Sequence, residues 1–132
     1  MTLNDNLLKV GWARDRHSYW WNVVKNSFPQ LSDKPEPEFR LNIRPANFSG
    51  RAGRDRQTFK YYCEYRVCYF HEPNYDETIC HEICHIAAHI VNGGYFDHGA
   101  IWKYFFNHVC QINRGRCHNY DTDLAKRIAD SK

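Results

Sequence analysis

The sequence has no apolar run that approaches the roughly 20 residues needed to cross a bilayer. Its start, MTLNDNLLKVGWARDR, lacks the basic region and the continuous apolar segment of a secretory signal peptide. These absences argue against a membrane-spanning or exported protein. We therefore expect a protein without a membrane partner that stays in the cytoplasm, or in the nucleoid or nucleus if it associates with DNA.

The sequence also has no CxxC pair, the spacing that is typical of zinc ribbons and of thioredoxin-like redox motifs. The six cysteines, at positions 63, 68, 80, 84, 110 and 117, are interpreted as buried thiols rather than as a disulfide framework. No repeat or low-complexity tract interrupts the 132 residues, of which 42 % are apolar and 16 % aromatic. That composition is typical of a folded protein, and we expect a single domain over residues 1–132 that acts as a monomer.

Hydrophobic periodicity and turn residues predict helices first and last, with short strands between them. The helices are expected at residues 5–27, 75–91, 99–110 and 122–129. The strands are expected at residues 39–43, 58–63 and 65–70, with a glycine-containing turn at 49–54. This order predicts an α+β fold with an N-terminal helix and a small antiparallel three-stranded sheet.

The helix expected at 75–91 has the clearest boundary signals. Asn74, with Glu77 three residues later, resembles an N-cap and its capping-box partner. Gly93 and Gly94 follow the helix and form a typical C-terminal stop. Apolar residues recur along one side of it, at Ile79, Ile83, Ile86, Ala87 and Ile90. These signals place residues 81–85 within a helix.

Residues 81–85 read His-Glu-Ile-Cys-His, an HExxH motif. Histidines four apart on a helix differ by about 40° in direction and roughly 6 Å in rise, so both imidazoles can bind one cation. This pattern is typical of zinc hydrolases, and we expect one Zn²⁺ ion bound by His81 and His85. Glu82 points elsewhere and is placed to take a proton from a water that the metal acidifies.

A catalytic zinc site needs a third protein ligand. The candidates are the nearby acidic residues and the other histidines, His71, His89, His98, His108 and His118. His89 lies about 12 Å along the helix axis from His81, too far to share one ion easily. His98 is favoured because Gly93 and Gly94 let the chain reverse before it, and Gly99 permits close backbone approach.

HEICH at 81–85, followed thirteen residues later by HGAIW at 98–102, resembles the SprT-like zinc metalloproteases, the group that includes the DNA–protein crosslink protease Spartan. The family pattern is HExxH, a variable loop, then His-Gly-x-x-Phe/Trp. The segments FRLNIRPANFSGRAG and RCHNYD are similar to family segments on either side, and RVCYFHEPN is similar to the edge strand that precedes the family's active-site helix. The resemblance covers about residues 10–122. The zinc ribbon that many relatives carry, and the regulatory tails of Spartan, have no counterpart here.

The resemblance implies that His81, His85 and His98 bind zinc and that Glu82 is the general base. It implies a zinc-dependent metalloendopeptidase whose substrates are proteins associated with DNA or crosslinked to it. Two alternatives stay open: a non-peptidase zinc hydrolase, and a DNA-binding zinc module without protease activity. Four residues are candidates to stabilise the oxyanion of a peptide substrate, and the sequence does not rank them: Tyr95, His89, His118 and Tyr120.

Basic residues cluster between positions 40 and 66, where seven Lys and Arg accompany two acidic residues. Such an excess suits contact with phosphates, and aromatic residues among them could stack on bases, so single-stranded DNA is the expected second partner. The residues expected to contact nucleic acid are Arg51, Arg54, Arg56 and Lys60. A small second metal site is a further hypothesis, with the ligands Cys110, Cys117, His108 and His118.

Overall fold

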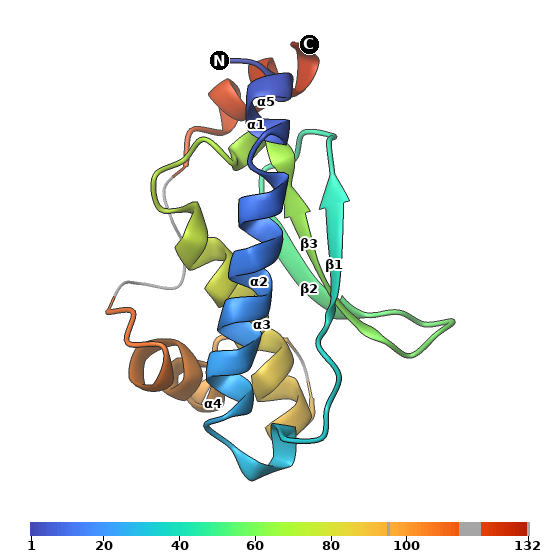
Figure 1. Ribbon diagram of the computed structural model, residues 1–132, viewed down its shortest axis with the longest axis vertical. Coiled ribbons are helices and arrows are strands. Elements are labelled where there is room, and N and C mark those ends of the chain that lie inside the picture. The colour runs from blue at the N-terminus through green and yellow to red at the C-terminus, as the bar shows by residue number, and fades with distance from the viewer. Residues whose placement is uncertain (95, 114–119, 132) are drawn as a thin grey trace.

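The computed structural model describes residues 1–94, 96–113 and 120–131. Two helices, α2 (Val10–Lys25) and α3 (Tyr75–Asn92), pack side by side against a three-stranded sheet (Figure 1). The strands are β1 (Glu38–Asn42), β2 (Gly50–Arg54) and β3 (Tyr61–Arg66), and the shorter helices are α1 (Leu3–Leu7), α4 (Ala100–Lys103) and α5 (Thr122–Asp130). This architecture confirms the α+β fold expected from the sequence.

The sheet is mixed, so the prediction of a wholly antiparallel sheet was wrong. The strand order is β1-β3-β2, with β3 antiparallel to β2 but parallel to β1. The chain leaves β1, passes to the far edge to form β2, and returns through the hairpin into the middle as β3. Alternating apolar residues define a strand and its buried face, but they do not define which neighbour it pairs with.

Two strand assignments also change. Residues 65–70, expected as an edge strand, supply the end of the central β3 and then a 3-10 turn over Val67–Tyr69. The glycine-containing stretch expected as a turn is the edge strand β2. A Cβ on Gly53 would lie 2.7 Å from the hydroxyl of Tyr62, its partner on β3, so any other residue there would have to displace the Tyr62 ring.

Most helices lie close to their predicted positions. The first is divided into α1 and α2, and the helix expected at 99–110 is α4 followed by a π-helical turn over Tyr104–Val109. Asn74 precedes α3 but makes no capping hydrogen bond through its side chain. Gly93 ends α3 with a φ of 71°, as the glycine pair predicted. None of the described helices combines the length and the apolar character that a membrane span requires.

The helix α3 packs against both α2 and the sheet, and much of it belongs to the core. Most residues from Tyr75 to Ala87 are buried, including Tyr75, Ile79 and Ile83 at 0 % exposure. At the surface, Asp76 of α3 accepts two hydrogen bonds from Arg16 and one from the indole of Trp20, both on α2. The HExxH segment therefore lies on a fixed helix, and its side chains are held by packing on both sides.

Candidate metal centre and active site

The structure brings His81, His85 and His98 together. His81 and His85 lie one turn apart on α3, and His98 comes from the segment that leads into α4. The Nε2 atom of His81 is 3.2 Å from Nε2 of His85 and 2.9 Å from Nε2 of His98. Three imidazole nitrogens from two chain segments thus converge on one point, and the three residues form a candidate metal site.

The donor set fits a tetrahedral zinc ion. Nitrogens bound at about 2.05 Å to such an ion lie about 3.3 Å apart, close to the two Nε2 separations here. Burial, together with the neighbouring His98, lowers the pKa of His85 to about 4, so this imidazole is neutral at physiological pH. Neutral imidazole is the form that binds metal, and three ligands leave one position open for catalysis.

The local sequence explains why His98 reaches the site. Asp97 accepts a hydrogen bond from the backbone N–H of Gly99, which tightens the chain just before α4. A Cβ at Gly99 would lie 3.1 Å from that Asp97 oxygen. Trp102, one turn into α4, then donates from its indole N–H to the backbone carbonyl of His81 at 3.2 Å. The α4 segment is thereby fixed against the HExxH helix.

Trp102 also forms the wall behind the histidines. Its ring centroid lies 4.8 Å from those of His81 and His98 and 5.7 Å from that of His85, and it stacks on Phe106 at 4.7 Å. Only 2 % of Trp102 is exposed. The sequence singled out Trp102 only as part of a family pattern, whereas the structure shows that its ring packs against all three imidazoles.

Glu82 lies beside the histidines in a desolvated position. Its side chain is 6 % exposed, and burial raises the pKa of its carboxyl to about 8. A bound dication nearby would lower this pKa and favour the carboxylate form. A buried carboxyl whose pKa lies near neutrality can both accept and return a proton, as a general base requires.

A cleft of about 290 Å³ opens over Glu82, His81 and His98. Its other walls come from residues 47–50 at the start of β2, from Tyr69, and from Thr78, Tyr120 and Thr122. Thr78 lies one turn before Glu82 on α3, and its hydroxyl is 2.9 Å from that of Tyr120. A Cβ on Gly50 would lie 3.4 Å from Cγ of Glu82 and 3.2 Å from the carbonyl of Glu64. Gly50 therefore lets the edge strand approach the carboxyl.

Sequence reasoning missed Gly50 and Thr78 as parts of this cleft. The spacing of Thr78 and Glu82, four residues on one helix, could have placed the hydroxyl beside the carboxylate. Nothing in the sequence pairs Gly50 with Glu82, because their proximity depends on the path of β2 along the sheet edge.

The structure shows which of the other candidate residues lie at the cleft and which do not. Tyr120 lines the cleft, whereas His89 lies beyond it, stacked on Phe96 at 4.5 Å. His71 is distant from the cleft lining and contacts Asn6 instead. Tyr95, Cys117 and His118 lie outside the described residues. The hypothesis of a second metal site from Cys110, Cys117, His108 and His118 therefore rests on residues that the structure describes only in part.

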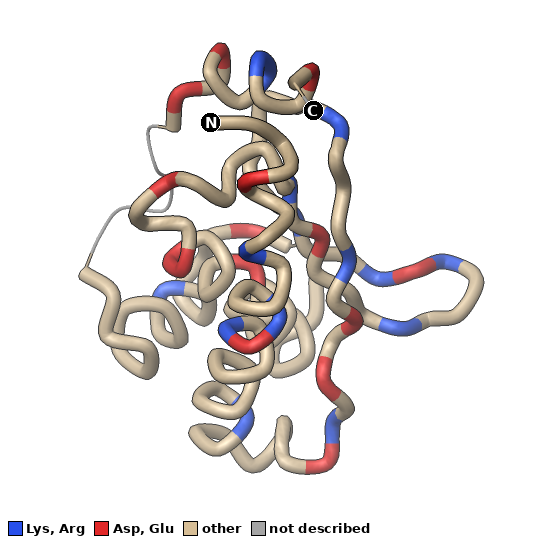
Figure 2. The backbone as a smooth tube through the Cα atoms, turned by 45° about the horizontal axis from the view of Figure 1, so that its top comes forward, with Lys and Arg blue, Asp and Glu red and all other residues tan. Residues whose placement is uncertain are grey.

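The basic residues expected to contact nucleic acid lie on the β2–β3 hairpin, which projects from the molecule (Figures 1 and 2). Arg51 pairs with Glu64 at 3.1 Å, and Arg54 donates to the carbonyl of Phe59 at 2.9 Å. Arg56 and Lys60 are exposed on either side of the hairpin tip. Asp55 lies between Arg54 and Arg56 in the sequence and interrupts the positive charge of the hairpin, and it is paired with Arg40 at 3.1 Å.

Comparison with known proteins agrees with this geometry. The SprT-like family model matches residues 19–122. Over 49 residues the chain is 37 % identical to Germ cell nuclear acidic protein of Homo sapiens, an alignment that covers 33 % of this chain and 7 % of that protein. No solved structure matches the chain significantly. Since the family match includes both α3 and His98 and takes in most of the sequence, the chain belongs to the SprT-like family.

Proposed function

We propose that this protein is a zinc metalloendopeptidase whose zinc ligands are His81, His85 and His98 and whose general base is Glu82. The observation that supports this most strongly is the convergence of three Nε2 atoms within about hydrogen-bond distance, directly beside a buried carboxyl. The SprT-like family is generally linked to zinc metallopeptidase function, which agrees with this donor set. Zinc bound there would acidify a water molecule and polarise the scissile carbonyl.

The side chains of this chain would do the remaining work. An oxygen of the Glu82 carboxylate accepts the proton of the attacking water and later delivers it to the leaving amine. His81, His85 and His98 would hold the ion, and their rings pack against the ring of Trp102. The hydroxyl of Tyr120, held by Thr78 at 2.9 Å, is the group in the cleft best placed to donate to the developing oxyanion.

The edge strand β2 offers a way to hold an extended substrate. β2 pairs with β3 on one side only within the described sheet, and its first residue, Gly50, lies against Glu82. A peptide that adds to β2 as a further strand would carry its main chain across the cleft. This assigns substrate binding to the edge strand at residues 50–54, whereas residues 65–70, expected as the edge strand, supply the end of the central β3 and the turn after it.

A substrate panel separates the protease from a non-peptidase zinc hydrolase. Zinc-loaded protein should cleave unfolded proteins and long peptides, lose this activity on chelation, and regain it with added zinc. His98→Ala should lower zinc affinity and abolish cleavage. Cleavage of esters or phosphodiesters without any cleavage of peptides would contradict the proposal. A zinc ion with four protein ligands would instead support a structural zinc module.

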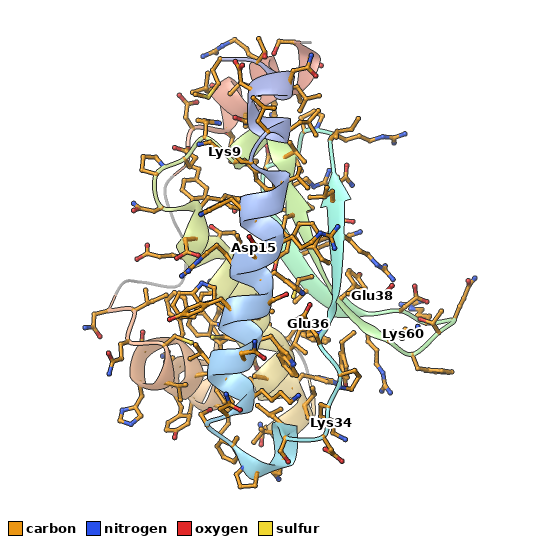
Figure 3. The ribbon with its side chains drawn as sticks, viewed as in Figure 1. Lys9, Asp15, Lys34, Glu36, Glu38 and Lys60 are labelled. Carbon is orange, nitrogen blue, oxygen red and sulfur yellow. The ribbon has the colours of Figure 1, made fainter. Side chains whose placement is uncertain are left out.

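We further propose that the substrates are proteins bound to single-stranded DNA. The observation behind this is a hollow of about 400 Å³ beside the hairpin, with cations and an exposed aromatic ring on its walls. Phe59, near the hairpin tip, is 65 % exposed and has a positive φ of 61°. Three cations, Lys34, Arg54 and Lys60, line the same hollow together with two carboxylates, Glu36 and Glu38; Figure 3 shows Lys60 on the hairpin and Lys34 before β1.

An exposed ring with neighbouring cations suits stacking on an unpaired base beside a phosphate. Phe59→Ala should weaken binding of single-stranded DNA roughly tenfold, since a stacked base contributes about 1–3 kcal/mol. Lys60→Ala should lower the salt dependence of binding, whereas Lys126→Ala, on the distant α5, should not. Binding unchanged in both hairpin variants, or cleavage indifferent to DNA, would contradict the DNA proposal and leave the protease proposal intact.

A further inference from the structure

Three buried cysteines form a second cluster of metal-binding groups, away from the histidines. Cys80 and Cys84 lie one turn apart on α3, and Cys110 is the residue that ends the π-helical turn over Tyr104–Val109. Sγ of Cys84 is 3.9 Å from Sγ of both Cys80 and Cys110, and all three sulfurs lie within 4.8 Å of one another. Cys80 and Cys84 are 0 % exposed and Cys110 is 8 % exposed.

The thiol cluster and the histidine centre use the same two turns of α3 but different faces. Cys80 immediately precedes His81, and Cys84 immediately precedes His85. Successive residues on a helix differ by about 100° in direction, so the thiols and the imidazoles lie on different faces of α3. The partner segments differ as well, since His98 comes before α4 and Cys110 follows the π-helical turn. The two clusters therefore do not share a ligand.

Two of the three separations between the sulfurs, from Cys84 to Cys80 and from Cys84 to Cys110, match those of metal thiolates. Sulfurs bound at about 2.3 Å lie about 3.8 Å apart around a tetrahedral ion and about 4.0 Å apart around a trigonal one. The 3.9 Å separations here fall in that range, and burial on all sides fixes the three side chains. Thiolate donors select soft ions, and zinc(II) and copper(I) are the d¹⁰ ions that prefer them.

We propose that Cys80, Cys84 and Cys110 bind one thiophilic d¹⁰ ion, zinc(II) or copper(I), as a metal site separate from the histidine centre. The ion ties α3 to the segment that carries Phe106, which in turn stacks on the Trp102 wall behind the histidines. Binding releases thiol protons and stabilises the folded chain, because the three thiols converge only in the native structure. The π-helical turn, whose wide winding sets the position of Cys110, is a feature often found at functional sites.

Cobalt(II) substitution tests whether the three cysteines bind zinc(II), and it does so without an activity assay. Metal-free, reduced protein is titrated with cobalt(II), whose bonds to thiolates give charge-transfer absorption in the near ultraviolet that imidazole ligands do not give. Wild type should bind one ion with this absorption in addition to the histidine-bound ion. His98→Ala should keep the thiolate absorption, because the histidine centre contributes none of it. Copper(I) is tested in parallel by competition with a chromophoric copper(I) chelator.

Cys84→Ala removes the central sulfur and should abolish the thiolate absorption and the tight copper(I) binding. Cys68→Ala is the matched control, since Cys68 is equally buried at 0 % exposure but lies outside the cluster. Circular dichroism establishes whether each variant is folded. If a variant is not folded, the titration of the wild-type protein alone tests whether the thiolate site binds metal. Folded wild type without thiolate absorption and without tight copper(I) binding overturns the proposal, as does full absorption in folded Cys84→Ala. Either result leaves the protease proposal untouched, because no cleavage is measured.

Discussion

Trp102 connects the fold to the metal centre, and its replacement by phenylalanine tests that connection quantitatively. Trp102→Phe keeps an aromatic ring behind the histidines but removes the hydrogen bond from the indole N–H to the carbonyl of His81. It also removes part of a ring that contacts all three imidazoles. The lost hydrogen bond contributes about 1 kcal/mol to stability.

Trp21→Phe is the matched control for this change. Trp21 is 1 % exposed, and its indole nitrogen has no hydrogen-bond partner among the described residues. The same loss of ring volume there therefore removes no hydrogen bond. The free energy of unfolding of metal-free Trp102→Phe should fall about 1 kcal/mol further than that of Trp21→Phe, measured by urea denaturation.

Metal affinity should separate the two variants more clearly. Groups that hold metal ligands in place typically contribute roughly tenfold or more to affinity, equivalent to about 1.4 kcal/mol. Competition with a chromophoric chelator should show zinc binding about tenfold weaker in Trp102→Phe and nearly unchanged in Trp21→Phe. Wild-type zinc affinity in Trp102→Phe would refute the inference that this indole organises the histidine centre.

Three further perturbations follow from other contacts. Gly50→Ala should destabilise the protein by about 1–2 kcal/mol in urea denaturation and slow cleavage, because the new Cβ would meet a backbone oxygen at 3.2 Å beside Glu82. Gly11→Ala is the control: this position on α2 has open space around it, so the substitution should stabilise the protein by about 0.5–1 kcal/mol. Asp76→Asn should cost about 1 kcal/mol in urea denaturation by weakening the partly exposed contacts with Arg16 and Trp20, while the exposed Asp123→Asn should change little. Burial lowers the pKa of His17 below its usual 6.5, so at acidic pH the unfolded chain binds a proton at this residue more readily than the folded chain does. The free energy of unfolding should therefore fall as the pH drops below about 6.5, by up to about 1.4 kcal/mol per pH unit. The variant His17→Gln should reduce that slope.

The sequence predicted the parts of the site that depend on local spacing. Histidines four apart within an amphipathic helix, ended by Gly93, predicted both α3 and the convergence of His81 and His85. His98 could be favoured over His89 because one helix cannot bring residues eight apart to a single ion. The structure places His98 beside His81, as expected.

The parts that depend on tertiary packing could not be predicted in this way. Residues 50–54 contain two glycines and read as a turn, yet their small size is what lets β2 lie close to Tyr62 and Glu82. The parallel pairing of β1 with β3 depends on where the chain crosses the sheet, which no local pattern encodes. The cysteine cluster shows a partial signal: Cys80 and Cys84 have helical spacing, but nothing local brings Cys110 to them.

The most direct test of the central claim is the cleavage rate of an unfolded protein substrate by zinc-loaded Glu82→Gln. Glutamine preserves the shape of the side chain but cannot accept the proton. Glu77→Gln, on the first turn of the same helix and outside the cleft lining, is the matched control. We predict one zinc ion in the histidine centre of both variants, no measurable cleavage by Glu82→Gln, and a rate close to wild type for Glu77→Gln. Wild-type cleavage by zinc-loaded Glu82→Gln would contradict the account.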